Sequence, residues 1–307
     1  GCTKVSQGCK HCYAERDWNR LAHLPAYQGR AFTDVECHLE RLKQPMLWKR
    51  PRMIFVNSMS DLFHEDVPDS FIDQVFGVMA LERQHTFQVL TKRPARMRDY
   101  CKTLGQHNGT DRVSIAAQQI SSKAGFLWRM GDVGWCLPNV WLGVSVEDQP
   151  AADERIPLLL QTPAAVRWVS AEPLLGPVSL VVPFDGARVD AAKGARPGIP
   201  GLDWVVVGGE SGPKARPMHP DWARSLRDQC AAAGVPYLHK QNGEWISADQ
   251  DECPVGGPAA RWMWADGQQW SKHDGQRAIP LFCRAGKKAA GRLLDGELHD
   301  GCPELAK

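Results

Sequence analysis

Short apolar runs that end in polar residues alternate along the chain with segments whose apolar residues recur at helical spacing. In residues 68–82, for example, Phe71, Val75 and Val78 recur near helical spacing, and Pro68 stands at the start, as is common at the beginning of a helix. The expected strands lie in residues 52–63, 86–94, 139–148, 165–176, 202–212 and 235–245, and the expected helices in residues 68–82, 95–104, 150–161 and 219–234.

Strands that alternate with helices predict a parallel sheet, wound either as an open sheet or as a barrel. Each expected strand is a nearly continuous apolar run, as in sheets covered on both faces. Almost every strand then ends in polar side chains, and in a (βα) barrel all such ends meet on one face. In an open sheet only a few would converge on one ligand. The fold class predicted is therefore α/β, a complete or partial (βα) barrel.

Two regions depart from this alternation, and the composition changes near the C-terminus. We expect residues 105–137 to be an irregular insertion with a short helix near 122–129, and residues 176–201 to be a surface loop. From about residue 246, tryptophans and glycines punctuate short segments. The prediction is a barrel-like domain over residues 1–245 and a small β-rich appendage over residues 246–307.

The composition is that of a folded protein: 43% of the 307 residues are apolar and 23% are charged. A net charge of +2 predicts no strong overall attraction to nucleic acid or membranes. No apolar run is long enough to cross a bilayer. Seven of the ten cysteines are scattered, and we expect them to be small buried hydrophobes. Together these features favour a reducing, cytoplasmic location.

The other three cysteines, Cys2, Cys9 and Cys12, fall in the first twelve residues. A structural zinc site needs four protein ligands, yet the chain has no second C-x-x-C; the fourth ligand would come from His11, His23, Cys37 or His38. Three thiolates would instead suit a [4Fe–4S] cluster with one iron open to a further ligand. From the residues alone, a cluster, a zinc site and plain structural cysteines all remain open.

Motifs along nearly the whole chain resemble the phage Gp37/Gp68 family, the three-Cys-motif family of unknown function (DUF5131). That family is similar to radical S-adenosylmethionine enzymes of the spore-photoproduct-lyase-like branch, although the spacing here is C-x6-C-x2-C rather than C-x3-C-x2-C. Members carry a strand before the first cysteine, so the resemblance implies that the first strand is missing by truncation. The motifs are "GCTKVSQGCKHCYAE", "NSMSDLFHEDV", "LTKRPARM", "WLGVSVEDQ", "VSAEPLLGPV", "VVVGGESGPKARPM", "LRDQCAAAGVPYLHKQNGEW" and "GKKAAGRLLDG".

The resemblance implies a barrel of radical S-adenosylmethionine type, with the three cysteines as cluster ligands. S-adenosylmethionine would bind the open iron, and its reductive cleavage would give a 5′-deoxyadenosyl radical that abstracts hydrogen from a substrate. Ser58, Ser60 and Asp61 follow the first expected strand and would bind the cofactor's methionyl amine. Their alternative role is to cap a turn.

Further candidates stand at the other strand ends. Lys92 would pair with a carboxylate or phosphate of the cofactor. Glu210 would face the pocket as an acid or hydrogen-bond acceptor, and Lys240 would contact the substrate. Glu147 and Glu172 are alternatively partners in ion pairs with Lys92, Lys240 or Arg216. The complete set of expected cofactor contacts is Ser58, Ser60, Asp61, Lys92, Ser145, Glu147 and Glu172.

Two functional hypotheses follow. In the first, the protein is a radical S-adenosylmethionine enzyme that binds a [4Fe–4S] cluster and acts on an unknown substrate, with nucleic acid favoured. In the second, it is a non-catalytic zinc- or cluster-binding protein that binds nucleic acid or a partner protein. A three-Cys-motif protein often encoded beside this family is the expected protein partner in either case.

Overall fold

The computed structural model describes residues 1–25, 27–104, 107–121, 136–248, 262–264 and 281–304. The helices are α1 (Tyr13–Leu21), α2 (Asp69–Leu81), α3 (Pro94–Leu104), α4 (His107–Ile120), α5 (Gln149–Leu160), α6 (Pro220–Ala233) and α7 (Lys287–Ala290). Short 3-10 turns occupy Gln7–Cys9, Leu39–Arg41 and Pro45–Leu47. The strands are β1 (Met53–Val56), β2 (Thr86–Thr91), β3 (Val140–Ser145), β4 (Val166–Ala171), β5 (Val181–Phe184), β6 (Ala187–Asp190), β7 (Trp204–Gly208), β8 (Tyr237–Gln241), β9 (Trp245–Ser247), β10 (Trp262–Trp264) and β11 (Leu281–Arg284).

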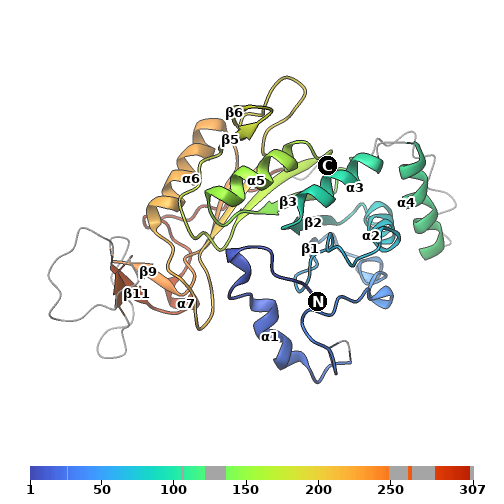
Figure 1. Ribbon diagram of the computed structural model, residues 1–307, viewed down its shortest axis with the longest axis horizontal. Helices are drawn as coiled ribbons and strands as arrows, with labels where there is room; N and C mark the ends of the chain where they lie inside the picture. The colour runs from blue at the N-terminus through green and yellow to red at the C-terminus, as the bar shows by residue number, and fades with distance from the viewer. Residues whose placement is uncertain (26, 105–106, 122–135, 249–261, 265–280, 305–307) are drawn as a thin grey trace.

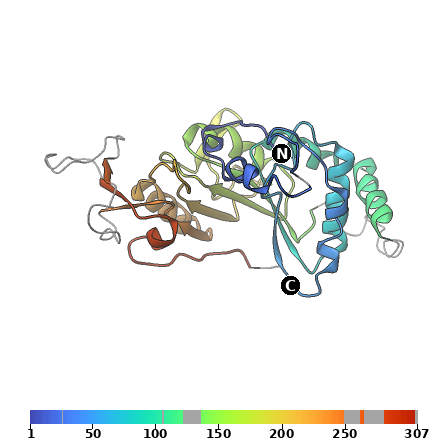
Figure 2. The ribbon, with the colours of Figure 1, turned by 90° about the horizontal axis from the view of Figure 1, so that it is seen from below.

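Six of these strands form one parallel sheet in the order β1-β2-β3-β4-β7-β8. Each strand lies beside the previous strand of the sheet along the chain, which is the order of a singly wound (βα) barrel. β1 and β8 are the two edge strands of this sheet. The sheet curls but does not close among the described strands, and it forms a half-barrel (Figures 1 and 2). The prediction of a complete or partial barrel is thus confirmed in its partial form.

The convex face of the half-barrel carries the main hydrophobic core. Leu142 and Val144 of β3 and Val169 of β4 are buried there against the helices α2, α3, α5 and α6. Local signals place these helices: the Asp148 side chain accepts a hydrogen bond from the Ala151 amide at the start of α5, and left-handed Gly234 ends α6. The expected helices in residues 68–82, 95–104, 150–161 and 219–234 are confirmed within one or two residues.

The concave face carries the alternate side chains of the same strands, and it is aromatic. Trp141, Trp168 and Trp204 form a second buried cluster that is separate from the main core, with the Trp168 and Trp204 ring centroids 5.4 Å apart. A side chain at Gly143, the partner of Trp168 in the adjacent strand, would place its Cβ 2.5 Å from the Trp168 indole. Gly143 therefore makes room for the indole on the inside of the curl.

Two segments differ from their predicted structure. Residues 107–120 of the expected irregular insertion form helix α4, which packs on α2 where Gly77 approaches Ala117. Its pattern was hard to recognise because its buried residues include small alanines and its first turn carries Asn108 and Gly109. The expected short helix near 122–129 lies outside the described residues.

The expected surface loop at 176–201 instead contains the antiparallel hairpin β5–β6. Val182 is fully buried in the main core, so the segment contributes to the packing of the convex face. Asp185 and Gly186, at the turn, both have positive φ, as the favoured two-residue hairpin turn requires. This Asp-Gly signal was present in the sequence and was missed.

Strands β9, β10 and β11 form a three-stranded antiparallel sheet at the end of the molecule opposite α4 (Figure 1). The chain then returns to the half-barrel: the His239 amide donates to the His299 carbonyl, and Gly301 donates to Tyr237. This tail lies antiparallel to β8, at the edge of the parallel sheet. It also contributes Leu294 to the main core.

The scattered cysteines only partly match the expectation of small buried hydrophobes. Cys101 and Cys230 are buried in the main core and Cys37 packs against it, whereas Cys136 and Cys302 are exposed. Cys283 is buried and disulfide-bonded, which removes one premise of the argument for a reducing compartment. Cys253 lies outside the described residues. None of the described helices is both long and apolar enough to span a bilayer.

Candidate functional site

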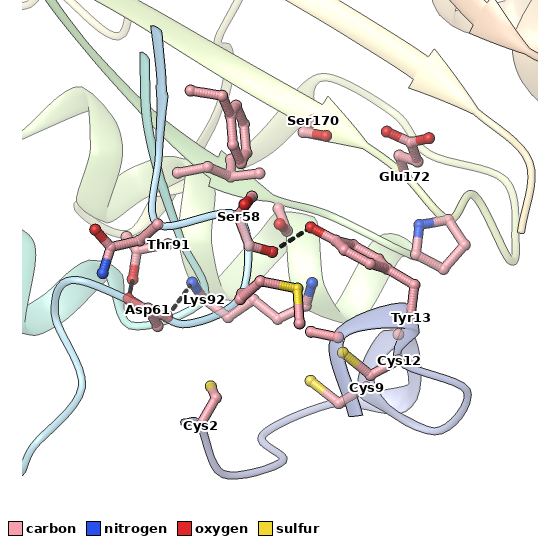
Figure 3. A pocket seen from close by; sticks show the side chains of 18 of the residues that line it. Cys2, Cys9, Cys12, Tyr13, Ser58, Asp61, Thr91, Lys92, Ser170 and Glu172 are labelled. Carbon is pink, nitrogen blue, oxygen red and sulfur yellow. Dashed lines mark hydrogen bonds between the residues drawn. The ribbon is translucent and has the colours of Figure 1, made fainter. Parts of the chain in front are cut away.

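A pocket of about 690 Å³ opens at the carboxyl ends of the parallel strands, and the N-terminal loop lies across it. Cys2, Cys9 and Cys12 all line this pocket, and all three are free thiols. In Figure 3 they lie along the lower side of the view, with Cys2 apart from the other two. The strand ends that the sequence predicts to converge do so, because Ser58, Lys92, Ser145, Glu172, Glu210 and Lys240 line the same pocket.

The first attachment of the loop holds Cys2 and Thr3. Arg93, which follows β2, donates from Nη1 to the Cys2 sulfur at 3.8 Å and to Asp61 at 3.2 Å. Its Nη2 donates to the Thr3 hydroxyl at 2.7 Å, and fully buried His64 lies 2.8 Å from the same hydroxyl. The Arg93 guanidinium therefore fixes the start of the loop.

Burial acts to raise the pKa of the Cys2 thiol, and the Asp61 carboxylate adds to this effect. The adjacent Arg93 guanidinium opposes both, because a cation favours the thiolate, yet the net direction is upward. Cys2 is thus held beside a cation, but in this conformation the free thiol is not activated. A ligand that needs the thiolate would have to displace its proton.

The second attachment is Ser6, whose hydroxyl donates to the Glu147 carboxylate at 2.8 Å. Glu147 also pairs with Lys92 at 3.0 Å and with buried Arg155 at 3.0 Å. Burial alone would raise the pKa of Glu147, but the two cations outweigh it and hold the pKa below its usual value. A Cβ at Gly8 would stand 2.5 Å from this carboxylate, so only glycine allows the loop to approach so closely.

The third attachment is Glu210, which follows β7. Its carboxylate accepts two side-chain hydrogen bonds from Arg216, at 2.8 and 2.6 Å, and lies 3.3 Å from His11. Arg216 also donates to the Gln7 carbonyl at 3.1 Å. Burial acts to raise the pKa of Glu210, but the hydrogen bonds and charge of Arg216 outweigh it, and the pKa is lowered. His11 and Gln7 flank Cys9 in the sequence, so this cluster holds the Cys9–Cys12 part of the loop.

These contacts bear on two of the predicted roles. Glu147 does not line the pocket, and its carboxylate is occupied by Ser6, Lys92 and Arg155. Glu210 lines the pocket, but its carboxylate oxygens are bound by Arg216 and His11. In this structure both residues therefore attach the cysteine loop to the half-barrel. The ion pair expected between Glu147 and Lys92 is formed.

The residues after β1 form a turn that contacts the Tyr13 hydroxyl. Asp61 accepts hydrogen bonds from the Thr91 hydroxyl at 2.7 Å and from the Lys92 amide at 3.1 Å, so it joins the ends of β1 and β2. The Ser60 hydroxyl accepts a hydrogen bond from the side-chain Nδ2 of Asn57 within the turn, and the Tyr13 hydroxyl donates to the Ser58 carbonyl (Figure 3). Burial, with some help from Cys12, raises the pKa of Tyr13 to about 12.

The opposite wall of the pocket combines an ion pair with free hydroxyls. Lys240 donates to Glu172 at 2.7 Å, which is the other ion pair expected from the sequence, and Gln241 donates to the second Glu172 oxygen at 2.7 Å. Ser145 and Ser170 are paired in register on β3 and β4. Within the described residues, their hydroxyls form no hydrogen bond. Gly209 permits close backbone approach, because a Cβ there would collide with the Asn242 carbonyl.

The donor set suits a thiolate-ligated group, because three free, soft sulfur ligands line a single pocket. However, no group of three or more His, Cys, Asp or Glu side chains among the described residues is arranged to hold a single metal ion. The cysteines are thus brought to one pocket but not around one point. A cluster whose irons each take one cysteine needs its ligands more widely spaced than a single ion does.

Several site residues were missed or underestimated from the sequence. Ser6 and Gly8 stand between the cysteines, and their spacing gave no reason to place them against Glu147, some 140 residues away. His11, a candidate fourth zinc ligand from the sequence, lies beside Glu210 instead. Buried Arg155 falls in an ordinary helical pattern. Met53 and Phe55 were interpreted as part of a buried strand, but both line the pocket. To predict this, one would have to know which face of β1 lies on the concave side of the sheet.

The fold and the site thus define a half-barrel protein with three cysteines at the mouth of its pocket. A family model described as "Protein of unknown function (DUF5131)" matches residues 1–303, and the chain belongs to this family, as the resemblance implied. No curated protein and no solved structure matches the chain.

Proposed function

We propose that this protein is a radical S-adenosylmethionine enzyme that binds a [4Fe–4S] cluster through Cys2, Cys9 and Cys12. The observation that carries the proposal is that these three free thiols line one pocket at the carboxyl end of a parallel half-barrel. This is the end of a (βα) barrel at which active sites lie. The substrate class proposed is nucleic acid, and binding of a three-Cys-motif partner protein remains a prediction.

The residues of the chain would divide the work between holding the loop and holding the cofactor. Arg93, Glu147 and Glu210 attach the loop at three points, which would keep the sulfurs in place with little reorganisation. The chemistry supplied by such a cluster is one-electron reduction of the bound sulfonium. Ser58 and Glu172 line the pocket and could receive the polar groups of S-adenosylmethionine. Tyr13, which follows Cys12, would limit access of water to that side.

A zinc site has less support. Zinc requires its ligands at about 2.0–2.3 Å from one point, and the described residues contain no such group of three. The cluster requires only that each thiolate reach a separate corner. A single zinc ion is therefore not the group that we propose for the loop.

The test is anaerobic reconstitution of the full chain with iron and sulfide. We expect about four irons per chain, a brown protein with charge-transfer absorption, and 5′-deoxyadenosine after addition of S-adenosylmethionine and a reductant. Single replacements Cys2→Ala, Cys9→Ala and Cys12→Ala should each abolish or sharply reduce iron binding. Matched controls are Cys136→Ala and Cys302→Ala, which remove exposed thiols elsewhere and should leave iron content unchanged.

The outcomes separate the alternatives. One zinc and no iron in a colourless protein would replace the cluster by the non-catalytic hypothesis. Four irons without any 5′-deoxyadenosine would retain the cluster and refute the radical chemistry.

A further inference from the structure

An unusual amount of apolar side chain is exposed inside the pocket. Met53 and Phe55 of β1 are 47% and 44% exposed, and Val5 and Tyr13 of the N-terminal region are each 45% exposed. All four line the same pocket. Large apolar side chains left in water at one concave site indicate a surface that a ligand covers.

The alternation of β1 places two of these side chains on the concave face. β1 is an edge strand of the half-barrel, and its residues alternate between the two faces. Ile54 and Val56 pack against the main core, whereas Met53 and Phe55 face the concave side. The pocket floor continues from Phe55 to Leu90 and Trp168, and the Phe55 and Trp168 ring centroids are 6.4 Å apart. We call this apolar part of the pocket the inner chamber: Met53, Phe55, Leu90, Trp168, Val206 and Leu238.

The carboxylates around the inner chamber are already matched within the protein. Each carboxylate that lines the pocket has a cationic partner: Asp61 with Arg93, Glu172 with Lys240, and Glu210 with Arg216. Polar groups without a hydrogen-bond partner among the described residues include the hydroxyls of Ser58, Ser145 and Ser170 and the buried Trp168 Nε1 and Gln241 Oε1. Of the cations that line the pocket, Lys287 has no acidic partner among the described residues. Ser145 and Ser170 are both more than nine-tenths buried, and both line the pocket.

A ligand for such a site should be uncharged and flat, with hydrogen-bonding groups on its edge. The ring of Tyr13 is held in place by the bond from its hydroxyl to the Ser58 carbonyl, and Phe55 offers a second exposed ring. Nucleobases combine a π-face that stacks on aromatic side chains with donors and acceptors on their edges. An aliphatic chain would leave the three hydroxyls unpaired.

We infer that the inner chamber binds one nucleobase of the substrate, stacked against Phe55 and Tyr13 and hydrogen-bonded by Ser145 and Ser170. This inference deepens the proposed function and rests on it for the reaction, because the chamber opens onto the cysteine loop. Binding itself does not require the cluster, so the two can be tested separately. The base is carried either by a free nucleoside or by a single strand of nucleic acid, since both present the same ring.

The test uses the fluorescent base 2-aminopurine, whose emission is quenched by stacking. The full chain is titrated with 2-aminopurine riboside, with a single-stranded oligonucleotide that carries one 2-aminopurine, and with an oligonucleotide that has an abasic position there and 2-aminopurine at its end. We expect quenching by one of the first two probes, which identifies the source of the base. The abasic oligonucleotide should bind at least about tenfold more weakly. No quenching with either base-bearing probe would overturn the inference.

Variants locate the site. Phe55→Ala and Tyr13→Ala should each weaken binding about tenfold or more. Tyr13→Phe keeps the ring and should lose much less. Leu47→Ala, which removes an apolar side chain that is 75% exposed outside the pocket, should change nothing. Phe55 and Tyr13 lie on different elements, so one variant remains informative if the other does not fold. If both alanine variants bind the probe as tightly as the wild-type chain does, the placement of the base against these two rings is overturned.

Two further measurements fix the class and the role of the ligand. N-acetyltryptophanamide, a flat uncharged ring of protein type, should compete poorly; better binding than the nucleoside would overturn the nucleobase assignment. The titration is repeated after reconstitution with saturating S-adenosylmethionine, and affinity should be unchanged. Displacement of the probe would place the cofactor's own base in the chamber and overturn the substrate role. Probe binding by a chain that takes up no iron on reconstitution would refute the proposed function and would still support base binding in the inner chamber.

Discussion

The two faces of the half-barrel are made by alternate residues of the same strands, yet they differ in nearly every property. On β3 and β4, Leu142, Val144 and Val169 point to the convex face and are almost completely buried against helices. Gly143, Ser145, Trp168 and Ser170 point to the concave face, around the pocket. The convex face supplies the apolar burial that stabilises the fold. The concave face carries the close contact between Gly143 and Trp168, two serine hydroxyls without partners among the described residues, and the exposed apolar side chains of β1. Stability alone does not require these features.

The largest expected effect tests this division directly. Leu142→Ala should lower the free energy of unfolding by about 3 kcal/mol, because it leaves a cavity in the convex core. Phe55→Ala, on the concave face, should lower it by less than about 1 kcal/mol, because Phe55 is already 44% exposed. Urea denaturation at neutral pH measures both. Comparable losses would mean that the concave face contributes to stability as much as the core does.

A smaller effect is expected at the closest approach on the concave face. Gly143→Ala would place a Cβ 2.5 Å from the Trp168 indole, and the rigid ring must shift to relieve the contact. We expect the free energy of unfolding to fall by about 2 kcal/mol, as is typical of overpacking, and the tryptophan fluorescence to change. Gly176→Ala is the control, since its Cβ would meet only Asp148 at 3.6 Å. If the Gly143 variant is as stable as this control, the indole is not fixed where the structure has it.

At the rim of the pocket, the stabilisation that Glu210 contributes should depend on pH. Glu210→Gln removes a carboxylate held by Arg216, and we expect a loss of about 1–2 kcal/mol at pH 7. The folded-state pKa of Glu210 lies below its ordinary value of 4.5, so its stabilisation is complete above that pH and is lost as the pH falls through the folded-state pKa. The difference between wild type and variant should therefore shrink below about pH 4.5.

Urea denaturation at pH 7 and at pH 3.5 checks this expectation. Glu154→Gln is the matched control, because the Glu154 side chain is well exposed and its contact to Arg155 is long. The control should lose little at either pH. A Glu210 difference that grows on acidification would have the opposite sign and would contradict the ion pair as described.

The smallest effect is expected at the exposed ion pair on the opposite wall. Lys240→Gln breaks the contact with Glu172, but the lysine side chain is half exposed and solvent screens the pair. The loss should be about 0.5 kcal/mol or less and should disappear at high salt. If binding of the proposed substrate falls while stability does not, Lys240 acts in recognition as the sequence suggested. A loss well above about 1 kcal/mol would show that the pair is structural.

The sequence was sufficient for the order of the main elements and for the end of the sheet at which the site lies. The apolar runs predicted all six parallel strands, and their polar endings predicted many of the polar residues that line the pocket. It failed where local signals were weak, as in α4 with its small buried residues, and where the Asp185–Gly186 turn was overlooked. For Glu147 the sequence left a cofactor contact and an ion pair open, and for Glu210 it predicted an acid or acceptor facing the pocket; the structure adds the long-range partners of both carboxylates.

The sequence by itself determined a parallel βα arrangement and three thiols near a set of polar strand ends, because periodicity and strand-end chemistry are local properties. Only the tertiary structure decided that the sheet stops as a half-barrel and that Met53 and Phe55 remain exposed on its concave side. It also decided which acids hold the loop, since Ser6 meets Glu147 and His11 meets Glu210 across long stretches of chain. Such pairings depend on how the whole sheet curls, which no single segment encodes.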